Sequence, residues 1–436
     1  MSDRAPTDWA SAVPALSVTC TAVDDPGALV DLLPPDIDPL TWVRRGDGLV
    51  GWREAARFST AGPDRFTAVR DWWASLVMRS RVRDEVGLPG SGLVTWCSFA
   101  FADGSPTASV AVVPEIIVGR RAGRCWVTRI RVVDRTRSVR PRDLYPVAPR
   151  PDGRTDTPMP PGEPAWADGA LGAAQWQDAV ATVVRRIRAG DARKVVLARD
   201  TVARTVDPVD LRWPLGRLAD AYRPCWTYCV DGLFGATPEL LLRSDRGLVT
   251  SRVLAGTIGR TGDPDADAAA LAATLSASSK DLSEHRLAVE SAAEVLARQC
   301  SSINVPDEPF VLHLPNVLHL ATDVTGVLAS PTGLFDLVAQ LHPTAAVGGT
   351  PQSAALGLIS ELEQMDRGRY AGPVGWVDAG GDGELGIALR CAQLDDADPR
   401  QLRAFAGCGI VADSDPVAEL AESTAKLVPI RDALSS

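Results

Sequence analysis

The stretch "GCGIVADSDPVAELAESTAK", residues 407–426, carries two carboxylates and a lysine with the spacing of one helical face. Asp415 predicts the start of that helix, because an aspartate side chain can accept hydrogen bonds from the first N–H groups of a helix. Glu419, Glu422 and Lys426 then follow at intervals of three and four residues, which places them on one side. This face can supply oxygen ligands to a divalent cation, or it can be a solvated face with a Glu422–Lys426 ion pair.

A second acidic pair occurs in "SASSKDLSEHRLAVESAAEVL", where Asp281 and Glu284 stand three residues apart at an expected helix start. Alone, the pair has the spacing of a capping box, in which Glu284 would reach back to the backbone of Asp281. Together with Glu419 and Glu422, it suggests that two helix faces converge on one cation. Mg²⁺ fits such a site because it prefers oxygen ligands and keeps positions for water and for a substrate carboxylate.

A candidate base and a candidate acid come from two strand-like segments. In "ARKVVLARD", strand alternation puts Lys194 on the same face as Val196 and Ala198. If this lysine is buried, its pKa falls toward the range of a general base; alternatively, its ammonium group reaches water at the strand end. In "GATPELLLRS", Glu239 stands among apolar residues, where a carboxyl group would have a raised pKa and act as an acid. The alternative is a glutamate in water at the end of a strand.

Anion-binding groups are expected in three further stretches. In "ELGIALRCAQL", Arg390 shares its strand face with Gly386 and Ala388, which leaves room for a ligand carboxylate that the guanidinium can bind in bidentate fashion. "LAGT" at 254–257 and "AGCG" at 406–409 offer backbone N–H groups without bulky side chains in front of them.

The composition narrows the class of protein. The chain has 436 residues, a formal net charge of −10 and no basic stripe, which argues against a nucleic-acid partner. No apolar run reaches the roughly 18–20 residues of a membrane span, and the N-terminus lacks the pattern of a signal peptide, so we expect a cytoplasmic protein. The eight cysteines form no CxxC pair, which favours reduced thiols over a zinc site or disulfides.

The chain divides at a segment rich in proline and arginine. Residues 134–168 read as a long loop or linker, which separates a less patterned part (1–168) from a better patterned part (169–436). The second part contains a helix around 176–187, a strand from 192, and short apolar runs joined by turn signals, with helices expected between 280 and 363. This pattern predicts an α+β fold with large antiparallel sheets, in a sandwich-like core surrounded by helices.

Several of these stretches, in this order, resemble the chorismate-utilising enzymes and most closely the isochorismate synthases. The resemblance covers roughly residues 176–434 and implies that the first 168 residues contribute to the same fold. The matching segments are "KVVLAR", "GATPELLLR", "LAGT", "SKDLSEHR", "LHL", "LHPTAAVGGTP", "DRGRYAGPVGW", "IALRCA" and "FAGCGIVADSDPVAELAESTAKL".

The resemblance implies roles for the acid and base candidates. Lys194 corresponds to the general base that activates water for attack at C2 of chorismate, and Glu239 to the general acid that protonates the departing C4 hydroxyl.

It also implies two further sets of residues. Glu284 and Glu422 correspond to Mg²⁺ ligands, with Asp281 and Glu419 as their water-mediated or outer partners. The remaining residues correspond to contacts with the substrate: Tyr370 and Arg390 on the enolpyruvyl carboxylate; Gly256, Thr257, Gly407 and Lys426 on the substrate's carboxylates; His319 and Thr344 near the hydroxyl that leaves or arrives.

Differences between branches of the family favour isochorismate synthase. Ala255 stands where aminodeoxychorismate synthases commonly carry a lysine, and "EHRLAVESAAEVLA" replaces the "ARND" stretch of anthranilate synthases. "LHPTAAVGGTP" resembles isochorismate synthases rather than salicylate synthases. A salicylate synthase, which adds pyruvate elimination, and a non-catalytic chorismate-binding homologue are the alternatives. Cys408 replaces the alanine more often found between the two glycines, and we expect it to be a core thiol.

The resemblance carries expectations about partners and pathway as well. The chain has no glutaminase-like segment, and we expect no such subunit and a monomer. The sequence leaves open whether isochorismate would feed menaquinone, a siderophore or salicylate. A composition rich in alanine, arginine, glycine and proline suggests a bacterium with a GC-rich genome and slightly favours menaquinone.

Overall fold

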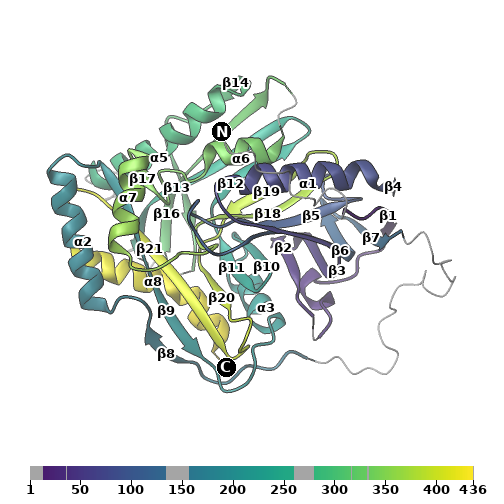
Figure 1. The fold of residues 1–436 in the computed structure, drawn as a ribbon, viewed down its shortest axis with the longest axis horizontal. Coiled ribbons are helices and arrows are strands. Elements are labelled where there is room, and N and C mark those ends of the chain that lie inside the picture. Colours follow the sequence, from purple (N-terminus) through teal and green to yellow (C-terminus); the bar gives the residue numbers. More distant parts are fainter. Residues whose placement is uncertain are drawn as a thin grey trace, which may run out of the picture.

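The computed structural model describes residues 13–35, 37–133, 157–259, 279–315, 317–330 and 333–435, and for 255–259 and 279–284 it describes the backbone alone. Within these residues the fold is α+β, as predicted. Helices pack around one large curled sheet, in which β1 and β4 are parallel and the other described ladders are antiparallel (Figure 1). None of the helices in the described part of the chain is long and apolar enough to cross a membrane.

The elements before residue 134 pair with one another at one side of the sheet, whereas the strand at 165–168 lies apart from them and pairs with residues 201–204. β2 pairs with β10, and β5 pairs with β18, so these strands continue directly into the later part of the chain. The elements are β1 (Leu16–Val23), the 3-10 helix η2 (Leu29–Leu32), β2 (Leu40–Arg44), β3 (Asp47–Thr60), α1 (Arg65–Arg79), β4 (Arg81–Asp84), β5 (Val94–Ser98), β6 (Ser109–Arg121), β7 (Arg124–Val132) and β8 (Ala165–Asp168).

β8 corrects the predicted extent of the linker. Ala165–Asp168 pair with β9, so the segment predicted as a loop over 134–168 becomes a strand at its end, where it satisfies backbone groups of β9. Residues 134–156 lie outside the described residues, and the division between 1–168 and 169–436 stays a prediction.

The remaining elements follow the predicted alternation of strands and helices. They are α2 (Ala173–Arg188), β9 (Lys194–Arg204), α3 (Arg212–Ala221), β10 (Trp226–Val230), β11 (Leu233–Thr237), β12 (Leu240–Asp245), β13 (Leu248–Gly259), α5 (Ser279–Ala297), β14 (Cys300–Asn304), β15 (Phe310–His313), β16 (Val317–Leu328), α6 (Leu334–Leu341), β17 (Gly349–Thr350), α7 (Gln352–Leu362), β18 (Pro373–Asp378), β19 (Gly383–Ile387), β20 (Cys391–Leu394), β21 (Gln401–Ile410) and α8 (Pro416–Leu434).

The turn signals of the sequence are confirmed as hairpins. β10 and β11 are joined by Asp231 and Gly232, which both have positive φ (54° and 73°), as a tight two-residue hairpin requires. Arg246 and Gly247 join β12 and β13 in the same way, with φ of 51° and 85°.

Region 280–363 contains strands as well as the helices that the sequence predicts. It contains the expected helices α5, α6 and α7, but the strands β14, β15 and β16 lie between them. β16 pairs with β13 on one side and with β14 and β15 on the other. An interior strand of this kind is buried over most of its length, so it lacks the simple alternation that marks a strand with one face in water.

β9 is the element around which the site is built. It pairs over most of its length with β21, and at its start with β17. α2, α7 and α8 gather at this side of the molecule, and a cluster of buried apolar residues that includes Trp176, Val180 and Leu197 joins them to the sheet (Figure 1). α2, the helix predicted around 176–187, buries Trp176, Val180, Val183 and Ile187.

Candidate active site

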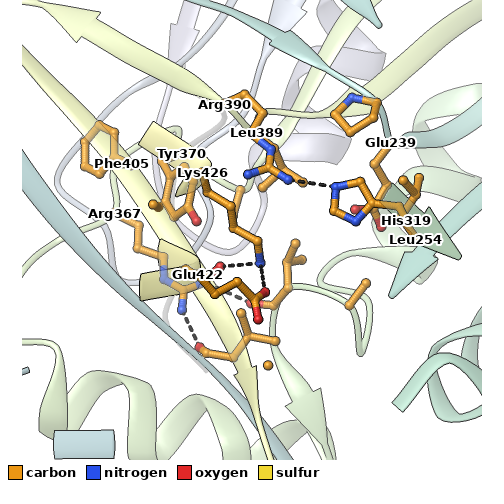
Figure 2. A pocket seen from close by; sticks show the side chains of 18 residues that line it. Glu239, Leu254, His319, Arg367, Tyr370, Leu389, Arg390, Phe405, Glu422 and Lys426 are labelled. Atoms are coloured by element: carbon orange, nitrogen blue, oxygen red, sulfur yellow. Dashed lines mark hydrogen bonds and ion pairs between the residues drawn. The ribbon is translucent and has the colours of Figure 1, made fainter. Parts of the chain in front are cut away.

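A cavity opens between β9, β21, α8 and the turns that connect the neighbouring strands (Figure 2). It contains about 720 Å³ of space, part of which is open to solvent. Segments that are far apart in the sequence supply its walls. The lining residues are Val196, Pro238, Glu239, Leu254, His319, Ala346, Val347, Arg367, Tyr370, Ala371, Leu389, Arg390, Phe405, Ala406, Gly407, Gly409, Glu422 and Lys426.

The start of α8 forms as its sequence predicts. The Asp415 side chain accepts hydrogen bonds from the N–H groups of Val417 (3.1 Å) and Ala418 (2.8 Å), and Pro416 is the first helical residue. This cap fixes the first turn of α8 and thereby directs Glu419 toward β21, where only 2% of its surface is exposed. A fully solvated acidic face is therefore excluded.

The ammonium group of Lys426 lies at the cavity wall. Its Nζ atom lies 2.6 Å from Oε1 of Glu422 and donates a hydrogen bond to the carbonyl oxygen of Gly407 at 2.9 Å (Figure 2). Burial alone would lower the pKa of Lys426, but the Glu422 carboxylate outweighs it, and the net effect raises the pKa. The ammonium group therefore stays charged and is available to an anionic ligand.

Two carboxylates of α8 lie close enough together to bind one cation. Ligand atoms of Glu419, Glu422 and Cys408 all lie within 4.8 Å of one another. The two carboxylates fit a hard cation such as Mg²⁺, whereas a thiol is a poor ligand for it. The Cys408 thiol is buried and donates a hydrogen bond to the backbone oxygen of Glu419 at 3.3 Å, as a core thiol would.

The other two predicted metal-site residues, Asp281 and Glu284, belong to α5. Asp281 and Glu284 lie in the first turns of α5, whose side chains are outside the described residues. α5 packs on β13 and β16, and β16 carries the cavity residue His319. Their convergence with Glu422 stays a prediction.

Glu239 lies in the short connection between β11 and β12 and is 5% exposed. Its backbone is held by two bonds: its N–H donates to Oγ1 of Thr237 at 3.2 Å, and its carbonyl accepts from the N–H of Ile387 at 3.2 Å. Burial raises the pKa of Glu239 to about 8, although the nearby charges of Lys194 and Lys426 act in the opposite direction. The carboxyl group is thus largely protonated at neutral pH and can donate a proton.

Lys194 is fully buried at the first position of β9. The solvent-exposed alternative for this residue is therefore wrong. Lys194 is paired in register with Thr350 of β17, and its charge affects the pKa of Glu239. It is outside the set of residues that line the cavity, whereas Val196, two positions later on the same strand face, is within that set. That Lys194 and Glu239 face each other across a bound ring stays a prediction.

Arg390 and His319 form a buried pair at the edge of the cavity. Nη2 of Arg390 lies 2.8 Å from Nε2 of His319, and the two residues are 7% and 5% exposed (Figure 2). Nη1 of Arg390 is buried and has no hydrogen-bond partner among the described residues. The guanidinium group therefore keeps donors available for a ligand, as a carboxylate clamp requires.

The backbone at Arg390 differs from the prediction. The alternation of "ELGIALRCAQL" predicts a continuous strand, but β19 ends at Ile387 and β20 begins at Cys391. Arg390 has a φ of 50°, a conformation that is costly for a residue with a side chain. A hydrogen bond from the N–H of Ala236 to its carbonyl oxygen at 3.2 Å supports this conformation.

Tyr370 and Gly407 face each other across the cavity wall. The Tyr370 ring stacks on Phe405, with centroids 5.1 Å apart and planes 8° apart. A Cβ atom at Gly407 would lie 3.0 Å from the Tyr370 hydroxyl oxygen and 3.1 Å from the carbonyl oxygen of Leu197. Glycine at this position therefore keeps both the tyrosine hydroxyl and the strand backbone accessible. Burial raises the pKa of Tyr370, so its hydroxyl stays a neutral hydrogen-bond donor.

Three residues that were predicted to contact the substrate, Thr344, Gly256 and Thr257, lie in the loop 343–348 and in β13. Thr344 is buried and outside the lining set, although Ala346 and Val347 of the same loop are within it. Gly256 and Thr257 belong to β13, where Thr257 is in register with His319 next to an irregularity of the ladder. The side chain of Thr257 lies outside the described residues.

Sequence reasoning missed several residues of the cavity. Phe405, Leu254 and Val347 lie in segments that match the family, but as apolar residues they gave no separate sign of a place in the cavity. Arg367 also lines the cavity and forms a buried ion pair with Glu363. Their spacing of four residues was visible in the sequence, but such spacing is also typical of surface ion pairs.

Comparison with known proteins places the chain in one family. The family described as "Chorismate binding enzyme" matches residues 41–435. Over 302 residues the chain is 40% identical to the "Putative isochorismate synthase MenF" of Mycobacterium tuberculosis, covering 66% of this chain and 78% of that protein. It is 36% identical over 263 residues to "Isochorismate synthase MenF" of Bacillus subtilis, covering 59% of this chain and 55% of that protein.

A third relative and two solved structures are also similar to this chain. The chain is 40% identical over 284 residues to the "Salicylate biosynthesis isochorismate synthase" of Pseudomonas aeruginosa, covering 64% of this chain and 59% of that protein. A crystal structure described as a putative 2,3-dihydroxybenzoate-specific isochorismate synthase of Bacillus anthracis superposes with a TM-score of 0.74 at 27% identity, over 93% and 98% of the two chains. The menaquinone-specific isochorismate synthase of Escherichia coli superposes with a TM-score of 0.72 at 23% identity, over 97% and 95%, and supports the fold alone.

Proposed function

Because the chain belongs to the family of chorismate binding enzymes, we propose that it is an isochorismate synthase, which converts chorismate to isochorismate. The matched segments span between 55% and 78% of the three curated relatives named above, all of which are named as isochorismate synthases. The observation that carries the proposal is one cavity that combines a protonated carboxyl group, Glu239, with two cations, the buried Arg390 and the half-buried Lys426.

The proposed reaction is a water exchange on the substrate ring. Water adds at C2, the hydroxyl at C4 leaves as water, and the ring double bonds shift, so the composition of the molecule is unchanged. Lys194, in its neutral amine form, takes one proton of the attacking water, and Glu239 gives its proton to the leaving hydroxyl. The raised pKa of Glu239 supports this assignment, because a general acid must be protonated at the working pH.

Substrate binding is assigned to the cations of the cavity. Chorismate is a dianion, and a chain with a net charge of −10 must attract it with local positive charge. We assign one carboxylate to Arg390 and Tyr370. The other is assigned to Lys426 and the backbone around Gly407, which the absence of a side chain leaves open.

We assign a Mg²⁺ site to Glu422 of α8 and Glu284 of α5, with Glu419 and Asp281 as their water-mediated or outer partners. When bound, the ion would neutralise charge on the ring carboxylate during the reaction. The close approach of the Glu419 and Glu422 carboxylates supports this site. Because the nucleophile is water, the proposed reaction needs no subunit that supplies ammonia.

Incubation with chorismate and Mg²⁺, followed by chromatographic separation of the products, tests the proposal. We expect isochorismate alone. Salicylate together with pyruvate would instead identify a salicylate synthase, and the absence of conversion would overturn the proposal. The Lys194→Ala variant separates an enzyme from a chorismate-binding homologue, because binding would survive this change and turnover would not.

A further inference from the structure

We propose that Glu363 and Arg367 form a positioning pair, which holds the cavity wall formed by β9 and the loop 343–348. The inference rests on the proposed function, since it concerns the rate of that reaction. Glu363 is the residue after α7, and Arg367 follows four positions later. Their side chains are only 1% and 3% exposed, and they form a two-bond ion pair: Nε to Oε2 at 2.9 Å and Nη2 to Oε1 at 2.5 Å.

The remaining donors of Arg367 bind two different cavity segments. Nη2 donates to the carbonyl oxygen of Val196 in β9 at 2.7 Å, and Nη1 donates to the carbonyl oxygen of Val347 in the loop at 2.9 Å. The guanidinium also lies over the Phe101 ring, 4.3 Å from its centroid. One side chain therefore fixes the distance between β9 and the loop.

Glu363 binds β9 two residues after Val196. Its Oε1 atom accepts a hydrogen bond from the N–H of Ala198 at 2.7 Å. Before this point, β9 pairs with β17 through Lys194 and Val195, and the N–H of Val196 donates to the carbonyl oxygen of Gly348 at 2.8 Å. The ion pair thus continues the short ladder and takes the place of a neighbouring strand along the part of β9 that lies beyond Gly349, the first residue of β17.

Arg367 contrasts with Arg390, the other buried arginine of the cavity. Arg390 has a buried Nη1 atom without a partner among the described residues, whereas all three nitrogen atoms of Arg367 donate to protein groups. Arg390 is therefore equipped to bind a ligand. Arg367 binds the protein, and its effect on the reaction passes through the position of Val196 and, two residues earlier on the same strand, of Lys194.

The expected consequence is a loss of rate rather than of substrate affinity. A displacement of about 1 Å in a reacting group can lower the rate about 100-fold. Lysine at position 367 would keep the positive charge but not the planar fork that reaches three partners. We expect Arg367→Lys and Glu363→Gln to lower kcat about 10- to 100-fold and to change KM for chorismate less than about twofold.

The matched control is Arg369→Lys. Arg369 is also buried and ion-paired, with Nη1 2.9 Å from Oδ2 of Asp231 and Nη2 donating to Oε1 of Gln393 at 2.9 Å. It is outside the set of residues that line the cavity. We expect this variant to lose thermal stability to a similar extent and to retain the wild-type kcat.

Hydrogen–deuterium exchange gives a readout that does not depend on activity. Peptides covering 194–199 and 344–350 should exchange faster in Arg367→Lys and Glu363→Gln than in the wild type, while peptides from α1 should not change. If the wild type makes no isochorismate, the proposed function fails, but this measurement still tests the positioning pair. Unchanged exchange in both peptides, an increase in KM at constant kcat, or an equal loss of kcat in Arg369→Lys would each overturn the inference.

Discussion

Two glutamates border the cavity, and their surroundings give them opposite electrostatic states. Glu239 is buried between β11 and β12, and burial raises its pKa to about 8. Glu422 on α8 has a lysine ammonium at 2.6 Å and forms an ion pair with it. The same type of side chain is thus neutral in one wall and ionised in the other. Under the proposed function, we infer that the cavity separates proton transfer from charge recognition, because each wall stabilises a different form of the carboxyl group.

The largest effect should come from removing the proton donor. Glu239→Gln keeps the shape of the side chain but cannot protonate a leaving hydroxyl, so we expect kcat to fall about 10²- to 10⁴-fold. The wild-type kcat should decrease above about pH 8, because the carboxyl group must be protonated and its pKa is about 8. The pH profile of the residual activity in Glu239→Gln should lack this decrease.

Asp378→Asn is the control for this pH profile. Asp378 is another buried carboxyl group, whose pKa burial raises to about 6, and it lies outside the cavity lining. Its replacement should leave the decrease above pH 8 in place. A Glu239→Gln variant that keeps the wild-type profile would show that another group is the acid.

The raised pKa of Glu239 should also make the free energy of unfolding depend on pH. The folded pKa of about 8 is above the ordinary value of 4.5, so between these pH values the folded state retains a proton that the unfolded state releases. The stabilising effect is complete below about pH 4.5 and is lost as the pH rises through 8. Relative to the wild type, Glu239→Gln should gain several kcal/mol of unfolding free energy over this interval, at about 1.4 kcal/mol per pKa unit.

Urea unfolding at a series of pH values measures this gain. Asp378→Asn should flatten the stability curve only between about pH 4 and 6, because the pKa of Asp378 is about 6. Parallel curves for the wild type and Glu239→Gln would contradict a raised pKa at Glu239.

On the charged wall, Glu422→Gln should weaken the metal site rather than the acid. We expect the Mg²⁺ concentration for half-maximal activity to rise about 10- to 100-fold, because a charged oxygen ligand is lost. The decrease above pH 8 should persist. Glu294→Gln, which removes an exposed carboxylate from an ion pair with Arg298, is the matched control and should leave the Mg²⁺ requirement unchanged. Equal Mg²⁺ requirements in all three proteins would place the metal elsewhere.

The local features of the cavity walls were predictable from the sequence, but their burial and their irregular backbone were not. The cap of α8 and the common face of its acidic residues depend on neighbouring residues, and the structure confirms both. That Glu419 is buried depends on its packing against β21, which the local pattern does not contain. Arg390 was expected in a regular strand, but a hydrogen bond from distant Ala236 stabilises the break there.

The positioning pair shows the same limit more clearly. Glu363 and Arg367 are four residues apart, a spacing that alone indicates a weak surface pair. Their burial depends on β9, Phe101 and the loop 343–348, which are distant in the chain. The α+β class, the hairpins and the helices α2 and α8 were predictable, because turn signals and periodicity are local. The interior strand β16 was not, because burial on both faces removes its alternation.

The smallest effect should come from Asp415, which lies outside the cavity lining but starts the helix that carries Glu422. Asp415→Ala removes two hydrogen bonds at the N-terminus of α8 and should cost about 1 kcal/mol of stability. Because the first turn would loosen, we expect the Mg²⁺ requirement to rise about twofold, without any change in the decrease above pH 8. Asp415→Ser, which can still cap the helix, should restore both values. If Asp415→Ala altered the pH profile instead, the two walls would be coupled, and the separation between proton transfer and charge recognition would not hold.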